Sequence, residues 1–210
     1  MKDFIKRLRY KWQLKSLKQR VNRSEPLKLI IGAGNTSQDG WIATDKDLLD
    51  VTDAMSWEVL LQDKKAVNVL AEHVIEHLTF AEVKNALTNI LLYLSDNGCL
   101  RIAVPDGFNT DVDYINYVKP NGWGAGSEDH KILWNVNSLT EILERTGYYV
   151  VPRQYFTENG KFVCEPIESL NGEISRKDID NRTSNDCWGG HATKNSMVYT
   201  SLIVDAYKRA

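Results

Sequence analysis

Cysteine is scarce in this chain of 210 residues. There are three cysteines, an odd number, and none of them forms a CxxC pair: Cys99, Cys164 and Cys187. This pattern argues against a disulfide framework and against a cysteine zinc site, and it favours a reducing compartment. We therefore expect a cytoplasmic protein.

Long apolar segments are also missing. No apolar run approaches the ~20 residues that cross a membrane, and the charged N-terminus lacks the apolar core of a signal peptide. We expect neither a membrane span nor a leader. Hydrophobic residues make up 42% of the chain and charged residues 26%, as is usual for one globular domain of this length.

Acidic residues are almost absent from the first 23 positions of the chain. Residues 1–23 carry five Lys and four Arg against Asp3, a net charge of +8, so the remaining chain must carry −10 to give the total of −2. A body with this negative charge would repel a polyanion, so we expect no nucleic-acid partner.

Residues 3–22 contain no glycine or proline and are predicted to form a basic amphipathic helix, so residues 1–23 are separated from a domain over 24–210. Two interpretations of the helix stay open. It lies on an anionic membrane surface or a partner, or it packs on the domain with solvated lysines. Its apolar residues fall in two sets at helical spacing: Phe4, Ile5, Leu8 and Trp12, then Leu14, Leu17 and Val21.

A third glycine is absent from the turn that follows the first predicted strand, residues 27–31. Gly32 and Gly34 allow a sharp turn close to a ligand, but Ser37 stands where a dinucleotide fingerprint has its third glycine. Only residues 35–40 separate this turn from the next strand, too few for a crossover helix. A pyrophosphate site is therefore weakly supported.

A carboxylate follows the second predicted strand, residues 41–44. At this position the side chain of Asp45 can accept hydrogen bonds from both hydroxyls of a ribose. The strand, glycine turn, second strand and terminal carboxylate together favour a ligand with a ribose but without a phosphate.

The remaining pattern predicts an α/β fold: a Rossmann-like, mostly parallel sheet with an antiparallel C-terminal edge and a reduced first helix. A capping box at Thr79 and Glu82 begins one helix, and Asn159-Gly160 suggests a hairpin. We expect strands at 48–51, 66–70, 99–104, 148–156 and 199–207, helices at 54–62, 79–95 and 138–146, and loops over 107–135 and 157–197.

Several motifs together resemble class I S-adenosylmethionine-dependent methyltransferases, in particular small bacterial ones often encoded among surface-polysaccharide genes. The resemblance covers roughly residues 27–152. The matching stretches are Ile31-Gly32-Ala33-Gly34-Asn35, Gly40-Trp41-Ile42, Asp45, residues 70–78, Asn97-Gly98 and residues 101–106.

The resemblance implies S-adenosylmethionine as cofactor and assigns residues to it. The turn of Gly32, Ala33, Gly34 and Asn35 would pass under the methionine part, and Asp45 would hold the ribose. Asp50, Val51 and Thr52 would border the adenine, and Ala71, Glu72 and His73 would line the sulfonium side. One position departs from the family, because Ile30 stands where an acidic residue is usual.

The acceptor side is expected in the two loop regions, residues 107–135 and 157–197. Asp106 and His130 are the candidate catalytic residues, with a carboxylate of Glu128 or Asp129 orienting the imidazole of His130. A small molecule or a glycan precursor is the expected acceptor. The acceptor site would have an aromatic wall formed by Tyr114, Tyr117 and Trp123. These residues would serve equally well as loop anchors.

Two other functions remain open. His73, Glu76 and His77 match HxxEH, the inverted zinc-protease motif, but no third metal ligand is evident and we expect no metal site. Alternatively, the domain is a non-catalytic Rossmann-like module that acts through its basic helix, an interpretation supported by Ile30.

Overall fold

The computed structural model describes residues 2–174 and 200–209. Part of the loop region expected on the acceptor side, residues 175–197, lies outside these described residues. None of the helices within the described ranges has the length and apolar character needed to cross a bilayer.

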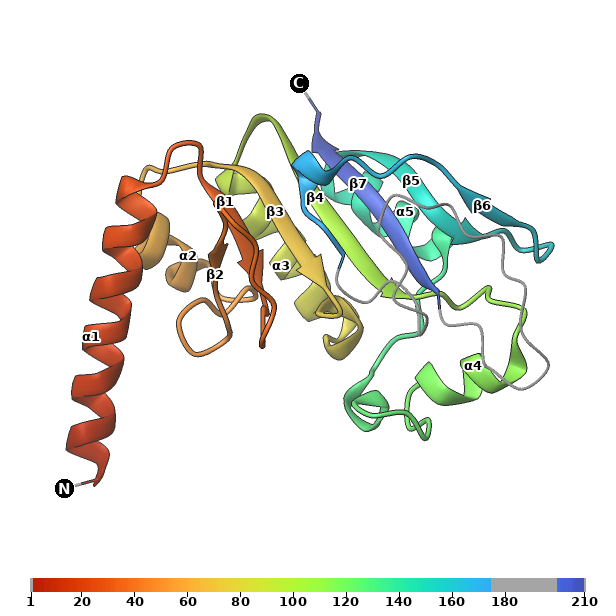
Figure 1. The fold of residues 1–210 in the computed structure, drawn as a ribbon, viewed down its shortest axis with the longest axis horizontal. Coiled ribbons are helices and arrows are strands. Elements are labelled where there is room, and N and C mark those ends of the chain that lie inside the picture. Colours follow the sequence, from red (N-terminus) through yellow and green to blue (C-terminus); the bar gives the residue numbers. More distant parts are fainter. Residues whose placement is uncertain (1, 175–199, 210) are drawn as a thin grey trace.

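A seven-stranded sheet forms the centre of the described structure (Figure 1). Its strand order is β2-β1-β3-β4-β7-β5-β6. The strands are β1 (Lys28–Ile31), β2 (Ile42–Ala43), β3 (Ala66–Glu72), β4 (Leu94–Pro105), β5 (Tyr148–Phe156), β6 (Phe162–Cys164) and β7 (Ser201–Lys208).

The sheet is mixed, as expected. β1 pairs in parallel with β2 and β3, and β3 pairs in parallel with β4. β7 is antiparallel to both β4 and β5, so β5 runs in the same direction as the parallel strands. β6 then pairs antiparallel with β5 after the turn at Asn159-Gly160, which confirms the hairpin.

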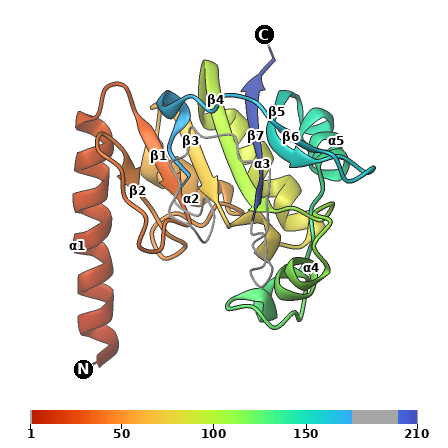
Figure 2. The same cartoon turned by 45° about the vertical axis from the view of Figure 1, so that its right-hand side comes forward.

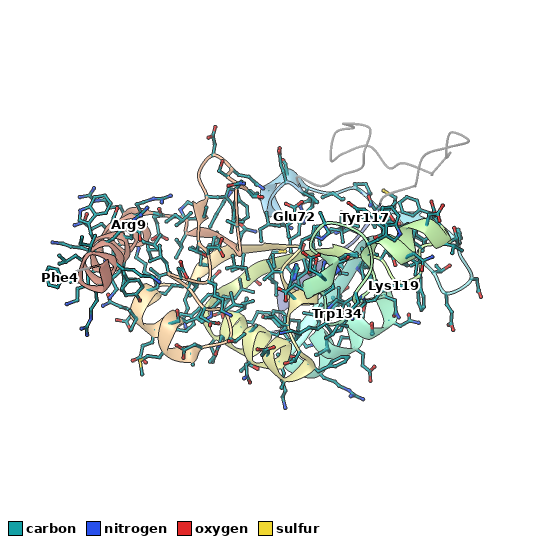
Figure 3. All side chains as sticks on the ribbon, turned by 90° about the horizontal axis from the view of Figure 1, so that it is seen from below. Phe4, Arg9, Glu72, Tyr117, Lys119 and Trp134 are labelled. Atoms are coloured by element: carbon teal, nitrogen blue, oxygen red, sulfur yellow. The ribbon has the colours of Figure 1, made fainter. Side chains whose placement is uncertain are left out.

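One face of the sheet is covered by helices (Figures 1 and 3). The main apolar core lies there, because alternate residues of the strands point toward α2, α3 and α5. The capping box of Thr79 and Glu82 begins α3 as predicted. The helices are α1 (Lys2–Arg23), α2 (Ala54–Leu61), α3 (Phe80–Tyr93), α4 (Val112–Val118) and α5 (Val136–Thr146), with 3-10 turns η1 (Ile75–His77), η2 (Ser127–Asp129) and η3 (Ser169–Asn171).

The opposite face carries a buried ion pair. Arg101 on β4 donates from Nε and Nη2 to the two carboxylate oxygens of Asp205 on β7, at 2.7 and 2.8 Å. Its Nη1 donates to the carbonyls of Glu168 and Gly172, at 2.7 and 2.6 Å. Arginine thereby ties the segment around η3 to the sheet.

Helix α1 has two apolar faces. Leu17 and Val21 are buried, whereas Phe4, Leu8 and Trp12 are 67%, 51% and 71% exposed. At about 100° per residue the two sets lie on nearly opposite sides of the helix. Figure 3 shows Phe4 on the outer side, pointing away from the domain. Packing on the domain therefore explains only the C-terminal half of α1.

Several local expectations are wrong. Residues 48–51 form turns instead of a strand, because the Asp45 carbonyl accepts hydrogen bonds from the N–H groups of both Leu48 and Leu49. The 107–135 region contains the short helix α4, which begins at an Asp111 cap. Cys99 is free and buried, but Cys164 is disulfide-bonded, contrary to the expectation from the cysteine pattern.

Candidate functional site

The turn after β1 is closed by hydrogen bonds to the end of β2. Ala33 N–H donates to the Thr44 carbonyl at 2.9 Å, and Thr44 N–H donates to the Ile30 carbonyl at 2.8 Å. The N–H of Gly34 donates to Oδ2 of Asp45 at 3.1 Å. Asp45, the residue predicted to bind the ribose, is thus held beside the glycine turn, and its side chain remains exposed.

Gly32 is required by both conformation and space. Its φ is +56°, in the left-handed region that favours glycine. A Cβ there would lie 2.7 Å from Cγ2 of Val74. The segments that follow β1 and β3 therefore approach each other closely at this point.

A pocket of about 380 Å³ opens beside this turn. The loops that follow β1, β3 and β4 gather at this end of the sheet (Figure 2). Five predicted cofactor residues line the pocket: Gly32, Asp45, Asp50, Val51 and His73. Thr52, also predicted, lines it too, together with Lys46, Leu49, Val74, His77, Leu78, Glu82, Asp129 and Lys131.

The other predicted cofactor residues do not line this pocket. Ala33 and Ala71 are buried in the apolar clusters, and Gly34 and Asn35 are exposed on the turn. Glu72 is half-buried at the end of β3 (Figure 3). Ile30, where the resemblance leads one to expect an acidic residue, is buried in the smaller apolar cluster and does not line the pocket.

The loop expected to border adenine is held from beneath by residues that the sequence did not indicate. Oδ1 of Asp50 accepts hydrogen bonds from N–H and Oγ1 of Thr52, at 2.9 and 2.7 Å. The Val51 carbonyl accepts from the side chains of Trp57 and Asn89, both at 3.1 Å. A tryptophan and an asparagine on helices α2 and α3 give no sequence signal for this role, because their partner is a backbone carbonyl.

The HxxEH stretch does not have zinc-protease geometry. His73 has a φ of +53° and precedes a 3-10 turn, so His73 and His77 do not share one face of an α-helix. Nδ1 of His73 lies 2.8 Å from Oε1 of Glu76, and Nε2 lies 3.4 Å from Oγ of Ser201. The zinc-hydrolase alternative is therefore wrong in the form predicted.

Asp106 is part of the framework and not of the pocket lining. Its side chain is fully buried, and its two oxygens accept hydrogen bonds from the N–H groups of Phe108 and Phe156, at 3.0 and 2.7 Å. Burial raises the pKa of Asp106 to about 6, against the opposing effect of these two donors. The structure gives Asp106 a positioning role between β4 and β5 in place of the expected contact with an acceptor.

His130 is oriented by a backbone carbonyl instead of a carboxylate. Its Nδ1 lies 2.6 Å from the Val118 carbonyl, and its ring packs edge-on against His77 at 4.8 Å between centroids. Asp129, expected to orient His130, instead lies 3.6 Å from Nδ1 of His77. His130 is thus beside the pocket, in contact with one of its lining residues.

Two of the three aromatic residues expected to form an acceptor wall lie together. Tyr117 and Trp123 pack edge-to-face at 4.6 Å. Tyr114 is fully buried, accepts a hydrogen bond from Asp106 N–H at 2.8 Å and donates to the Thr200 carbonyl at 2.6 Å. Tyr114 is therefore a loop anchor and not part of a wall.

No protein-family model and no curated protein matches the sequence. Among solved structures, a SAM-dependent methyltransferase from Archaeoglobus fulgidus is 18% identical, with a TM-score of 0.47 over 93% of this chain and 94% of that chain. A possible histamine N-methyltransferase from Thermotoga maritima is 12% identical, with a TM-score of 0.49 over 100% and 96%. The glycopeptide N-methyltransferase MtfA is 9% identical, with a TM-score of 0.45 over 94% and 93%. At TM-scores below 0.5, these similarities do not extend to activity or substrate.

Proposed function

We propose that this protein is an S-adenosylmethionine-dependent methyltransferase that acts on a small-molecule or glycan-type acceptor. The observation that carries the proposal is the pocket at the carboxyl ends of β1 and β3. It brings Gly32, Asp45, the 50–52 loop and His73 together from four separate stretches of the chain. Ligands of open α/β sheets bind at this end of the strands.

The pocket suits a nucleoside better than a nucleotide. No α-helix N-terminus follows the glycine turn, so the usual cradle for a pyrophosphate is absent from this part of the described structure. Asp45 is exposed at the pocket and has lone pairs left for ribose hydroxyls beyond the bonds from Gly34 and Lys46. Val51 and Leu49 supply apolar surface for an adenine ring.

Methyl transfer depends chiefly on the alignment of the acceptor atom with the methyl group of the cofactor. The acceptor atom attacks the methyl carbon in line with the sulfonium bond, that bond breaks, and the demethylated cofactor leaves. In the proposed arrangement the methionine end of the cofactor extends past Gly32 toward His73 and His77. The acceptor would then approach from the side of residues 107–135, where the exposed Trp123 packs against the half-buried Tyr117 and offers an aromatic surface.

Calorimetry tests this proposal directly. We expect the purified protein to bind S-adenosylmethionine and its demethylated product with one site per chain, and cofactor to be detectable by mass spectrometry after mild purification. No binding at millimolar ligand would overturn the proposal. Binding without transfer to any of a panel of sugars, amines and phenols would favour the non-catalytic alternative.

We further propose that α1 attaches the protein to an anionic membrane surface, where lipid-linked sugar acceptors would be found. The outward apolar face of Phe4, Leu8 and Trp12 is flanked by Lys11 and Lys15 at helical spacing. Exposed apolar side chains with flanking cations are the features of an interfacial helix. The N-terminal half of α1 also extends toward the end of the sheet where the pocket opens (Figures 1 and 2).

Vesicle flotation tests the attachment. We expect the protein to float with phosphatidylglycerol vesicles and not with phosphatidylcholine vesicles, and a Phe4→Ala/Leu8→Ala/Trp12→Ala variant to lose flotation at least tenfold. Met55 and Phe80 are similarly exposed but lie on other helices, so Met55→Ala/Phe80→Ala is the matched control. Equal flotation of the two variants would contradict the proposal.

A further inference from the structure

Three potential metal ligands meet beside the pocket from segments far apart in the sequence. Ligand atoms of Glu76, His77 and His130 all lie within 4.8 Å of one another. The backbone fixes the meeting, because the N–H of Lys131 donates to the Glu76 carbonyl at 2.7 Å. The cluster is therefore held by the fold and does not depend on exposed flexible side chains.

The orientation of His130 leaves one ring nitrogen available for a ligand. A carbonyl can only accept, so the 2.6 Å contact between Nδ1 and the Val118 carbonyl puts the hydrogen on Nδ1. In a neutral imidazole Nε2 then has a free lone pair. A histidine held through its other nitrogen by a backbone carbonyl is the usual arrangement in metal sites.

Glu76 presents a buried oxygen that lacks a partner. Its side chain is fully buried, and Oε1 is held at 2.8 Å by Nδ1 of His73. Among the residues that the structure describes, Oε2 has no hydrogen-bond partner, and Nδ1 of His77 has only the Asp129 carboxylate, at 3.6 Å, beyond hydrogen-bond distance. A buried acceptor left unpaired costs about 1–3 kcal/mol, and more when the group is charged. Such a cost is avoided if a cation occupies the space between these groups.

We propose that Glu76, His77 and His130 bind a divalent transition-metal ion, with Zn²⁺ or Mn²⁺ as the expected class. Two imidazoles and a carboxylate form a donor set suited to such ions. Two ligands bound through bonds of about 2.1 Å lie at most about 4.2 Å apart. Ligand atoms within 4.8 Å therefore need only small side-chain movements to close on an ion.

The proposed ion would border the pocket. His77 and Asp129 both line it, and Oδ2 of Asp129 lies 3.6 Å from Nδ1 of His77. The exposed carboxylate of Asp129 thus lies beside His77, on the solvent side of the cluster. Three fixed ligands leave a coordination position open toward the pocket, where an acceptor oxygen would bind. This last consequence rests on the proposed methyl transfer, whereas the metal site itself does not.

Metal binding can be measured without any cofactor or acceptor. Chelator-treated protein comprising residues 1–210 is titrated with Zn²⁺ alone and with Mn²⁺ alone, in competition with a chromophoric chelator. Bound metal is counted by elemental analysis. We expect one equivalent per chain for the wild type, and at least tenfold weaker binding for His77→Ala, His130→Ala and Glu76→Gln. Glu128→Gln is the matched control, because Glu128 is an exposed neighbour outside the cluster.

Two further measurements keep the outcome clear if a variant folds poorly. Circular dichroism checks each variant, and the ring nitrogen resonances of His77 and His130 in the wild type should shift on addition of one equivalent of Zn²⁺. Binding that the His77→Ala/His130→Ala variant retains in full, or ring resonances that do not move, would overturn the site. Loss of cofactor binding with intact metal binding would contradict only the methyltransferase proposal.

Discussion

The N–H of Gly34 donates a hydrogen bond of 3.1 Å to the carboxylate of Asp45, eleven residues further along the chain. The bond links the glycine turn after β1 to the residue that follows β2. Asp45 therefore has two roles, since it closes the turn and presents its remaining lone pairs to the pocket. Substitutions at this position therefore affect both roles.

Asp45→Ala should weaken binding of S-adenosylmethionine by about 10- to 100-fold. Hydrogen bonds to a charged group contribute about 1.5–3 kcal/mol each, and the variant loses those to the ribose together with the tie to Gly34. Asp45→Asn keeps one acceptor oxygen and should bind with intermediate affinity. Calorimetry measures both, with Asp47→Ala as control, because Asp47 is also exposed nearby but does not line this pocket. A normal dissociation constant for Asp45→Ala would remove Asp45 from the ribose site.

Gly32→Ala should destabilise the fold by about 2–4 kcal/mol. The new methyl group would meet Val74 at 2.7 Å, in a backbone conformation that itself costs about 1 kcal/mol for alanine. Gly40 also has a positive φ, of +78°, but no atom within 4 Å of its Cβ position, so Gly40→Ala isolates the backbone cost. Urea denaturation should show the larger loss for Gly32→Ala, and adding Val74→Ala should recover part of it. Equal losses at the two glycines would contradict the close approach.

The sequence predicts most of the backbone turns and caps that surround this site, because each depends on a few neighbouring residues. Two glycines after a buried strand, an aspartate after the next strand and the Thr79–Glu82 capping box are each recognised within a few residues, and the structure confirms their conformations. The predicted strand at 48–51 fails because a single carbonyl, that of Asp45, captures two successive N–H groups and starts a turn. Apolar content alone does not reveal this competition.

Contacts between distant segments account for the rest of what the sequence could not predict. His130 meets His77 only because the Glu76 carbonyl accepts from Lys131 N–H, a backbone bond that any residue type could make. The burial of Asp106 likewise depends on the N–H of Phe156, fifty residues away. The side-chain chemistry of His130 and Asp106 made them candidates, but their contacts with distant backbone groups determine their roles.

Breaking the buried ion pair should cost far more than breaking an exposed one. Arg101→Met leaves the fully buried Asp205 with Arg153 as its remaining cationic partner at 2.9 Å, and it releases two carbonyls of the 168–172 segment. We expect a loss of about 3–5 kcal/mol in the free energy of unfolding. Lys64→Met, which breaks the exposed pair with Glu25, should cost less than about 1 kcal/mol. Urea denaturation compares them, and a small loss for Arg101→Met would show that the segment is held by other contacts.

Asp106 should make the protein less stable as the pH rises from about 4 to 6. Burial raises its pKa to about 6 in the folded chain, against an ordinary value of about 4 in the unfolded chain. The folded state therefore holds the Asp106 proton more tightly, so the raised pKa lowers stability progressively through this window and by a constant amount above it. A shift of two pKa units corresponds to about 2 kcal/mol between pH 4.5 and 7.5.

Asp106→Asn tests this linkage, because the variant cannot titrate at this position. Its stability is lower at every pH, since an amide nitrogen would face one of the two N–H donors that the carboxylate accepts. The difference between wild type and variant is therefore the informative quantity, and it should shrink by about 2 kcal/mol between pH 4.5 and 7.5. Urea denaturation at both pH values measures it, with Asp39→Asn as an exposed control. A difference that stays constant with pH would mean that the carboxyl is ionised throughout, held by its two backbone donors despite burial.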